Sequence, residues 1–381
     1  MLTPSRPARP VAGHVPALDG VRGVAVLLVL AHNFNVLADG GSPVARAVGL
    51  FMDWGWVGVQ LFFVLSGFLI TGILLESKRA TNYYRVFFAR RVVRIFPIYY
   101  AVLIATFVIA PLFLGHPVEG AEHQVYLWTY VANWAEPFGA GVALFPHFWS
   151  LSIEEQFYLV WPVVVRRLSP RGLLWVCVGL VVASLASRIA LRAVDFATTG
   201  PYMFTICRVD ALALGAIAAV LLRRPEVAAQ LDARRWALRV AVGLTIAVTF
   251  VATRGAPRTG LGTQTWGYTA FAVAFAALVL DATVTAARRD LLGRVLAVAP
   301  LRSVGRYSYA MYIFHTPLHL LIGLPALQRA LGDGDRGLGV AVGYFAIATA
   351  ATYVLALASY HLLEKHFLRL KRRYVIEAAA A

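Results

Sequence analysis

Long apolar stretches recur along the whole chain, and short polar segments rich in arginine separate them. A helix needs about 20 apolar residues to cross the hydrocarbon core of a bilayer. Stretches of this kind lie near residues 21–38, 55–75, 92–114, 148–166, 172–191, 203–222, 236–253, 266–287, 307–326 and 338–362. The pattern predicts an all-α, polytopic membrane bundle of about ten spans. We expect one membrane-embedded domain over 1–381, with a short tail from about residue 366.

The positions of Lys and Arg predict how these spans are oriented. If the N-terminus is cytoplasmic, most of the 35 Lys and Arg residues fall in cytoplasmic segments. The segments on the other side hold only Arg46, Arg192, Arg254, Arg258, Arg329 and Arg336. Because basic residues concentrate in cytoplasmic loops, we expect both termini in the cytoplasm. The Ala-, Val- and Arg-rich composition is typical of a high-GC bacterium, so the expected location is a bacterial cytoplasmic (inner) membrane.

Composition supports this class and argues against others. The chain is 60% hydrophobic and 14% charged, whereas soluble domains carry about 25% charged residues. The net charge of +16 is spread over short loops that face anionic lipid, so we expect no nucleic-acid binding. Cys177 and Cys207 lie in apolar spans and predict no disulfide framework. His361, Glu364 and His366 are expected at the membrane interface, and no metal site is predicted.

Charged residues within the predicted spans are the most informative feature. Glu154 and Glu155 interrupt an otherwise apolar stretch. A charge at the bilayer centre costs roughly 2.5–3.5 kcal/mol on insertion scales, so it is kept where it faces a polar cavity, a partner or a substrate. Other spans hold Arg22, His32, Arg188, Arg208, Asp210 and His315. Together these residues predict a polar chamber within the membrane.

The fourth predicted span places Glu154 and Tyr158 on one helical face, while Glu155 points elsewhere. At least one of the two carboxylates must be paired or protonated. Arg208 and Asp210 in the sixth span are candidates for a charge partner of this kind. A purely structural ion pair is the alternative for these two residues.

The first span carries two candidate functional residues. Arg22 lies at its cytoplasmic mouth, and His32 follows ten residues later, about 15 Å along a helix. A neutral imidazole near the bilayer middle can accept a proton from a hydroxyl group. A structural histidine that bonds to a neighbouring helix is the alternative.

Arginines and a polar stripe mark two further spans. Arg91 and Arg94 are three residues apart on one helical face, and two guanidinium groups together suit phosphate or pyrophosphate. Ordinary loop topology explains the same arginines equally well. In the ninth span, a polar stripe is expected to face a cavity or a partner helix rather than lipid. Its members are Ser308, Tyr312, His315 and His319.

Two other segments keep alternative interpretations. Ser66 precedes Gly67, but no Gly-x-Ser-x-Gly elbow surrounds it, so close helix packing through small residues is favoured. The longest loop, about 115–147, carries no Lys or Arg and is rich in aromatic residues. It is consistent with a cap over a cavity and with an ordinary aromatic belt segment.

Taken in order along the chain, these motifs resemble the acyltransferase-3 family of integral membrane O-acyltransferases. The resemblance covers nearly the whole chain, and it is specific because six motifs occur in the same order. They are Leu18-Asp19-Gly20 with Arg22 and His32, Phe62 to Phe68, Arg91-x-x-Arg94 with Pro97, Phe148 to Tyr158, Arg208-x-Asp210-x-Leu212, and Gly305 to His315.

The resemblance implies transfer from acyl-CoA, with an acetyl or short acyl group, to a hydroxyl of a carbohydrate or glycosylated acceptor. Acyl-CoA would be a co-substrate, with no permanently bound cofactor. Carried over to this sequence, His32 is the catalytic base, and Arg22 lies beside it, where it or a nearby donor stabilises the oxyanion. Covalent transfer of the acyl group through His32 is the alternative route. Arg91 and Arg94 engage the CoA phosphates, and Glu154 is the carboxylate of the fourth span.

The remaining candidates are expected to line the substrate cavity: Asp19, Ser66, Glu155, Tyr158, Arg208, Asp210, Tyr312 and His315. Many relatives carry an extracytoplasmic hydrolase-like domain, and we expect a stand-alone form here. One alternative is a macrolide or other secondary-metabolite sugar acylated from the cytoplasmic side. The alternative of another class is a transporter or flippase for an amphipathic solute, which explains buried charges but not the ordered motifs. The sequence does not indicate the oligomeric state.

Overall fold

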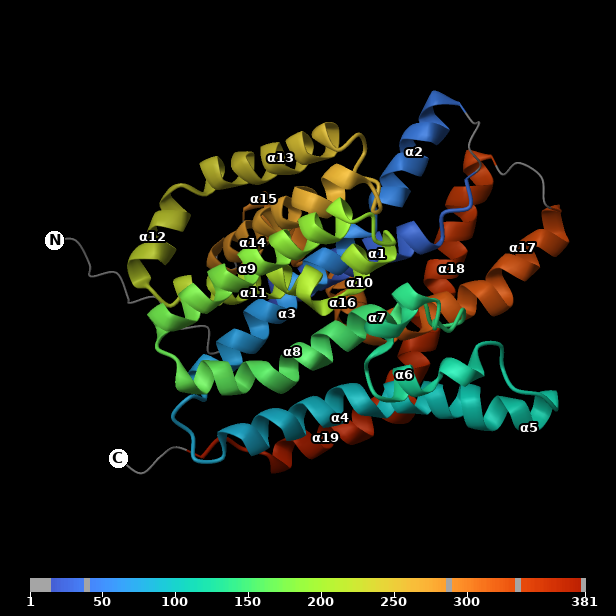
Figure 1. The fold of residues 1–381 in the computed structure, drawn as a ribbon, viewed down its shortest axis with the longest axis horizontal. Coiled ribbons are helices and arrows are strands. Elements are labelled where there is room, and N and C mark those ends of the chain that lie inside the picture. Colours follow the sequence, from blue (N-terminus) through green and yellow to red (C-terminus); the bar gives the residue numbers. More distant parts are fainter. Residues whose placement is uncertain (1–14, 38–41, 286–289, 333–336, 378–381) are drawn as a thin grey trace.

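In a computed structural model of the protein, every element of the described chain is a helix. The structure describes residues 15–37, 42–285, 290–332 and 337–377. The long helices are α1 (Pro16–Asn33), α3 (Val57–Glu76), α4 (Tyr83–Ile104), α8 (Phe148–Arg167), α9 (Pro170–Ala193), α11 (Thr205–Leu221), α13 (Arg235–Ala252), α14 (Tyr268–Val284), α16 (Ala299–Leu318) and α18 (Leu338–Ser359) (Figure 1). Each predicted span overlaps one of these helices, which confirms the all-α polytopic fold.

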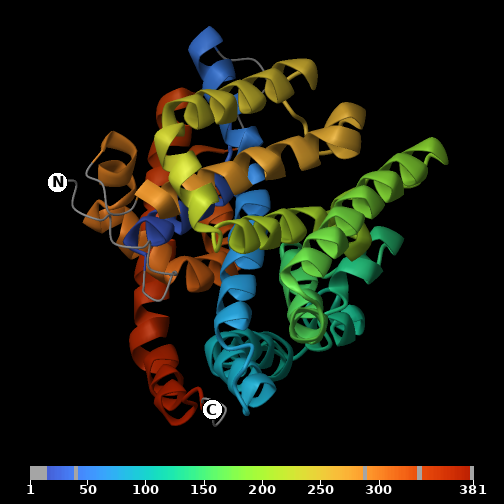
Figure 2. The ribbon, with the colours of Figure 1, turned by 90° about the vertical axis from the view of Figure 1, so that its left-hand side faces the viewer.

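Shorter elements extend or connect the long helices. Those within or beside long helices are α2 (Pro43–Trp54), η1 (Ala105–Ile109), α5 (Ala110–Leu114), η4 (Thr263–Gly267), η6 (His319–Gly323), α17 (Leu324–Leu331), η7 (Tyr360–Glu364), α19 (Lys365–Arg369) and η8 (Leu370–Arg373). The remaining ones are η2 (Ala121–His123), α6 (Val125–Trp128), α7 (Ala132–Ala135), η3 (Glu136–Phe138), α10 (Thr199–Met203), α12 (Pro225–Ala233) and α15 (Leu291–Leu296). Through the π-helical turn η7, α18 and α19 form one long rod along an edge of the bundle (Figure 2).

Eight helical stretches of the described chain are long and apolar enough to cross a membrane. They are Pro43–Glu76, Tyr83–Leu114, Pro170–Ala193, Thr199–Leu221, Arg235–Ala252, Thr263–Val284, Ala299–Leu331 and Leu338–Arg373. The other two predicted spans, α1 and α8, are helices of 18 and 20 residues. Polar residues lower the hydropathy of these two helices, and both of them carry residues of the candidate site.

Glycines allow two helix pairs in the core to approach very closely. A Cβ added at Gly67 of α3 would lie 1.9 Å from the carbonyl oxygen of Leu212 in α11. A Cβ added at Gly305 of α16 would lie 1.8 Å from the carbonyl oxygen of Asp19 in α1. Small residues allow this close approach in membrane bundles. The packing interpretation of Gly67 is therefore confirmed, and it fixes α1 and α3 against their neighbours.

Gly67→Ala is expected to destabilise the protein, because backbone atoms of α11 cannot move aside without separating the two helices. Gly72→Ala, in the same helix, is the matched control, since a Cβ there meets no atom within 4 Å. Replacing a helical glycine by alanine without a clash stabilises by about 0.5–1 kcal/mol. Thermal unfolding in detergent should therefore show a lower Tm for Gly67→Ala and an equal or higher Tm for Gly72→Ala. Equal Tm values in both variants would contradict the close contact.

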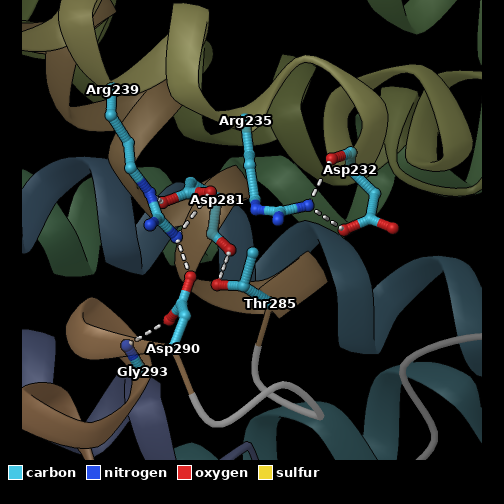
Figure 3. Close-up of polar contacts among 7 residues, drawn as sticks. All are labelled: Asp232, Arg235, Arg239, Asp281, Thr285, Asp290 and Gly293. Atoms are coloured by element: carbon cyan, nitrogen blue, oxygen red, sulfur yellow. Dashed lines mark hydrogen bonds and ion pairs between the residues drawn. The ribbon is translucent and has the colours of Figure 1, made fainter.

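A polar clamp holds α13, α14 and α15 together (Figure 3). The Nε atom of Arg239 in α13 lies 2.7 Å from Asp281 in α14, and its Nη2 atom lies 2.6 Å from Asp290. Asp290 also caps α15, since its side chain accepts a hydrogen bond from the Gly293 N–H at 2.8 Å. Both carboxylates are thus satisfied by the protein itself, and we assign this cluster a structural role.

The long loop between α5 and α8 is a folded cap on one end of the bundle. Tyr99 of α4 donates a hydrogen bond to the carbonyl of Leu127 at 2.7 Å. Gln156 of α8 donates to the carbonyl of Tyr130 and to the side chain of Asn133, both at 2.8 Å. These bonds pack the loop onto α4 and α8. None of the loop's described residues lines the pocket between α1, α3, α4, α8 and α16, so the structure does not support a cap over that pocket.

Candidate active site

A cavity with an empty volume of about 890 Å³ lies between α1, α3, α4, α8 and α16. Its polar wall consists of Arg22, Ser66, Arg91, Arg94, Ser150, Glu154, Glu155, Tyr158, Ser308, Tyr309 and Tyr312. Apolar side chains of α3, among them Phe62 and Phe63, form much of the remaining wall. Most residues singled out from the sequence therefore meet in one chamber, although five separate helices supply them.

Three guanidinium groups converge on this cavity. Arg22 and Arg91 both lie within electrostatic range of Arg94. Asp19 lies 3.6 Å from Arg22, and the guanidinium of Arg91 lies 5.2 Å from the centre of the Tyr158 ring. Like charges gathered in a cleft with apolar walls repel one another and attract an anionic ligand. This end of the cavity, which we call the arginine end, therefore suits a phosphate-bearing molecule.

Glu154 is the carboxylate that this cluster holds in place. Ser66 and Tyr158 supply hydrogen bonds to it, and Arg22 and Arg91 lie within electrostatic range. The hydroxyl groups of Ser66 and Tyr158 also form a short hydrogen bond with each other. Its charge partners are therefore the cavity arginines rather than the sixth-span pair considered from the sequence.

Glu155 also lines the cavity, so the expectation that it points away from Glu154 is wrong. Successive residues of a helix are separated by about 100° around its axis. The cavity extends around enough of α8 to receive both side chains. Two adjacent carboxylates thus face the three arginines.

Several residues expected on the cavity wall lie elsewhere. Asp210 forms an ion pair with Arg188 of α9 at 3.0 Å and accepts a hydrogen bond from Thr269 at 2.7 Å. The structural interpretation therefore holds for Asp210, with Arg188 as its partner. Asp19 pairs with Arg22 but does not itself line the cavity, and the His315 ring bonds within its own helix.

Arg208 is likewise absent from the wall, because an aromatic cage encloses it. Its Nη2 atom donates to Gln60 at 2.6 Å. Its guanidinium lies 4.1–5.9 Å from the ring centres of Phe63, Trp149, Tyr202 and Tyr268. Its Nε and Nη1 atoms have no hydrogen-bond partner in the described chain. Cation–π attraction compensates part of that cost, and the residue holds four helices or connecting segments together.

His32 lies at the other end of α1, outside the cavity wall. Its ring rests against the backbone of Asp53, with Arg258 within electrostatic range, and its Nδ1 atom has no hydrogen-bond partner in the described chain. Arg258 bonds to Tyr202, with its guanidinium 5.5 Å from the ring centre. His32 and Arg22 are thus separated by about 15 Å along one helix. The expectation that Arg22 lies beside the histidine is wrong, because a continuous helix keeps them apart.

A row of polar and aromatic side chains connects the cavity with His32. The Tyr312 hydroxyl contacts the Ser150 hydroxyl and donates to the carbonyl of His147 at 3.1 Å. The His147 ring centre lies 5.3 Å from that of Tyr312 and 4.6 Å from that of His315. His315 in turn lies within electrostatic range of His32. The polar stripe of α16 therefore faces the cavity and its partner helices, as predicted.

A strained turn directs Arg258 towards His32. Arg254, Gly255 and Ala256 all have positive φ angles, of 56°, 91° and 51°. For non-glycine residues such a conformation costs about 1–3 kcal/mol each and requires support from the surroundings. Trp56 donates to the carbonyl of Ala256 at 3.0 Å, and Tyr268 donates to that of Arg258 at 2.5 Å. Sequence analysis missed Arg258 because it resembled an ordinary loop arginine.

Glu136 of the cap lies near the same arginine and also escaped prediction. Burial raises the pKa of Glu136 to about 7, and Arg258 limits this increase. An unfolded glutamic acid has a pKa of about 4.3. The contribution of protonated Glu136 to the free energy of unfolding is therefore fully present below about pH 4, and it is lost as the pH rises through about 7.

Glu136→Gln is expected to reduce the fall in Tm between about pH 5 and 8, because glutamine does not titrate. Glu122→Gln, at an exposed position of the same cap, serves as the control and should retain the wild-type pH profile. Thermal unfolding across this pH range gives the measurement. Parallel profiles for wild type and Glu136→Gln would contradict the burial of this carboxyl.

Comparison with known proteins agrees with the geometry. The profile of the acyltransferase domain Acyl_transf_3 matches residues 15–361. The O-acetyltransferase OatA of Staphylococcus aureus is 26% identical over 369 residues, which cover 92% of this chain and 57% of that protein. The peptidoglycan O-acetyltransferase OatA of Listeria monocytogenes is 26% identical (92% and 55% covered), and the putative peptidoglycan O-acetyltransferase YrhL of Bacillus subtilis is 27% identical (92% and 54%).

These matches have clear limits. The chain spans little more than half the length of the curated relatives, and no solved structure matches it significantly. The profile nevertheless includes every helix that lines the cavity, from Arg22 in α1 to Tyr312 in α16. The chain therefore belongs to the acyltransferase-3 family of polytopic membrane proteins.

Proposed function

We propose that the protein transfers an acetyl or other short acyl group from acyl-CoA to a hydroxyl of a carbohydrate acceptor. The observation that carries this proposal is the convergence of Arg22, Arg91 and Arg94 on one cavity, with His32 farther along the same helix as Arg22. Two relatives support a carbohydrate acceptor, since one is a peptidoglycan O-acetyltransferase and the other a putative one.

The donor would enter at the arginine end, which we propose faces the cytoplasm, where CoA is made. Its phosphates would bind to Arg91 and Arg94, because guanidinium groups match phosphate oxygens in geometry and charge. The extended pantetheine arm would then lie along the cavity towards Tyr312. In the absence of donor, Glu154 balances part of the positive charge, and donor phosphates would compete with it for Arg91.

His32 would act as the general base of the transfer. It takes the proton from the acceptor hydroxyl, and the resulting oxygen attacks the thioester carbonyl carbon. The carbon–sulfur bond breaks, and the CoA thiolate receives the proton from the imidazolium, so the products are an ester and free CoA. Arg258 lies within electrostatic range of His32 and replaces Arg22 as the candidate that stabilises the oxyanion.

Titration calorimetry with acetyl-CoA on the detergent-purified chain tests the proposal directly. Saturable binding, together with release of free CoA when a carbohydrate acceptor is added, is the expected result. A correctly folded protein that binds no acyl-CoA would contradict the proposal and favour transport of an amphipathic solute. Binding with transfer only to a glycosylated secondary metabolite would retain the enzyme class and replace the acceptor.

A further inference from the structure

The last described residues fold back onto the beginning of α4 (Figures 1 and 2). Asn82 donates to the carbonyl of Val375 at 2.9 Å and accepts from the backbone N–H of Glu377 at 3.2 Å. Arg90 donates to the carbonyl of Tyr374 at 3.0 Å. These bonds, made largely by the backbone of the segment, fix the preceding helical turn η8 against the same helix that carries Arg91 and Arg94.

This arrangement places Lys371 of η8 among the cations of the arginine end. Lys371 is half-buried and lies within electrostatic range of Arg94, Arg91, Arg90 and Arg22. In the described chain it forms no ion pair with a carboxylate. Its neighbours Arg372 and Arg373 are exposed instead, so Lys371 alone among the three is turned towards the cavity arginines.

Such a gathering of cations is unfavourable without an anionic ligand. Asp19 and Glu154 lie near Arg22 and Arg91, and Glu364 lies within range of Arg94, so no carboxylate of the described chain is paired with Lys371. Several positive charges at short range and partial burial raise the local positive potential, which a molecule with several negative charges lowers on binding.

We propose that Lys371 binds a second phosphate of the acyl donor, so that the C-terminal segment completes the donor site. This inference rests on the proposed acyl-CoA-dependent function. CoA carries charge at two separate places, the 5′-diphosphate and the 3′-phosphate of its ribose. Arg91 and Arg94 are assigned to the diphosphate and Lys371 to the 3′-phosphate. Lys371 lies beyond residue 361, where the family match ends, so the assignment rests on the packing of this chain alone.

The test compares acetyl-CoA with 3′-dephospho-acetyl-CoA by titration calorimetry on the full, detergent-purified chain. Lys371→Ala is expected to weaken acetyl-CoA binding about tenfold, as for the loss of one charge-assisted hydrogen bond. Binding of the dephospho compound should change little. Lys371→Arg should restore the preference for acetyl-CoA, and Arg372→Ala should match wild type.

Asn82→Ala provides a second test, because it removes hydrogen bonds that hold the C-terminal segment on α4 without changing Lys371 itself. It is expected to reduce the preference for acetyl-CoA in the same direction. Equal affinity losses for the two compounds in Lys371→Ala, or no loss at all, would overturn the assignment. If the wild-type protein binds neither compound, the proposed function itself is wrong. This outcome differs from an error about Lys371, in which wild-type protein binds both compounds.

Discussion

His32→Ala is expected to lower acyl transfer by about 10²–10⁴-fold, the range for loss of a general base, while acyl-CoA binding is retained. Donor binding should be retained because His32 lies at the opposite end of α1 and does not line the cavity that would hold the donor phosphates. Transfer is measured as free CoA released in the presence of acceptor, and binding by titration calorimetry on the same preparation.

His116→Ala is the control for this experiment, because His116 is exposed in a loop away from the cavity and should leave both quantities unchanged. Unchanged turnover in His32→Ala would exclude His32 both as a base and as a covalent carrier of the acyl group. Loss of donor binding together with transfer would show that His32 acts at the donor end, contrary to the geometry.

The double variant Arg91→Ala/Arg94→Ala is expected to weaken acyl-CoA binding by at least about a hundredfold. Each hydrogen bond to a charged group contributes about 1.5–3 kcal/mol, and about 1.4 kcal/mol corresponds to a factor of ten in affinity. Because salt screens such contacts, wild-type binding should weaken as ionic strength rises, and the variant should respond less.

Arg85→Ala is the matched control, as this arginine is on the same helix but exposed. It should bind acyl-CoA with wild-type affinity at every salt concentration. A folded double variant with wild-type affinity would place the donor phosphates elsewhere. A variant that loses binding but still releases CoA at saturating donor concentration would support a role in binding alone.

The helices and much of the candidate site were predictable because their signals are local. Apolar runs of the length of a bilayer must form helices, since lipid offers no hydrogen-bond partners for an exposed backbone. Charged side chains in such runs cannot face lipid, so Arg22 and Glu154 were expected on the cavity that the structure shows, and Tyr158 followed because it shares the helical face of Glu154. The three-residue spacing of Arg91 and Arg94 placed them on one face of a helix.

Pairings between distant segments were not predictable in this way. The partner of Asp210 is Arg188, 22 positions earlier and on another helix, whereas the nearer Arg208 lies in an aromatic cage. Packing of α9 against α11 brings Arg188 to the carboxylate. Arg258 and Lys371 looked like ordinary basic loop and tail residues, because nothing in their own segments indicates what lies beside them.

The sequence by itself determined the number and type of helices, the polar interior and the separation of Arg22 from His32, since helical periodicity and desolvation act within single segments. Only the tertiary structure decided which ends of those helices meet. It placed three arginines, two carboxylates and the C-terminal segment at one end, and His32 with Arg258 at the other. The physical reason is that contacts between distant segments depend on the packing of the whole bundle. One arrangement of the helices must allow close backbone approach at the glycines and also give each buried charge a partner.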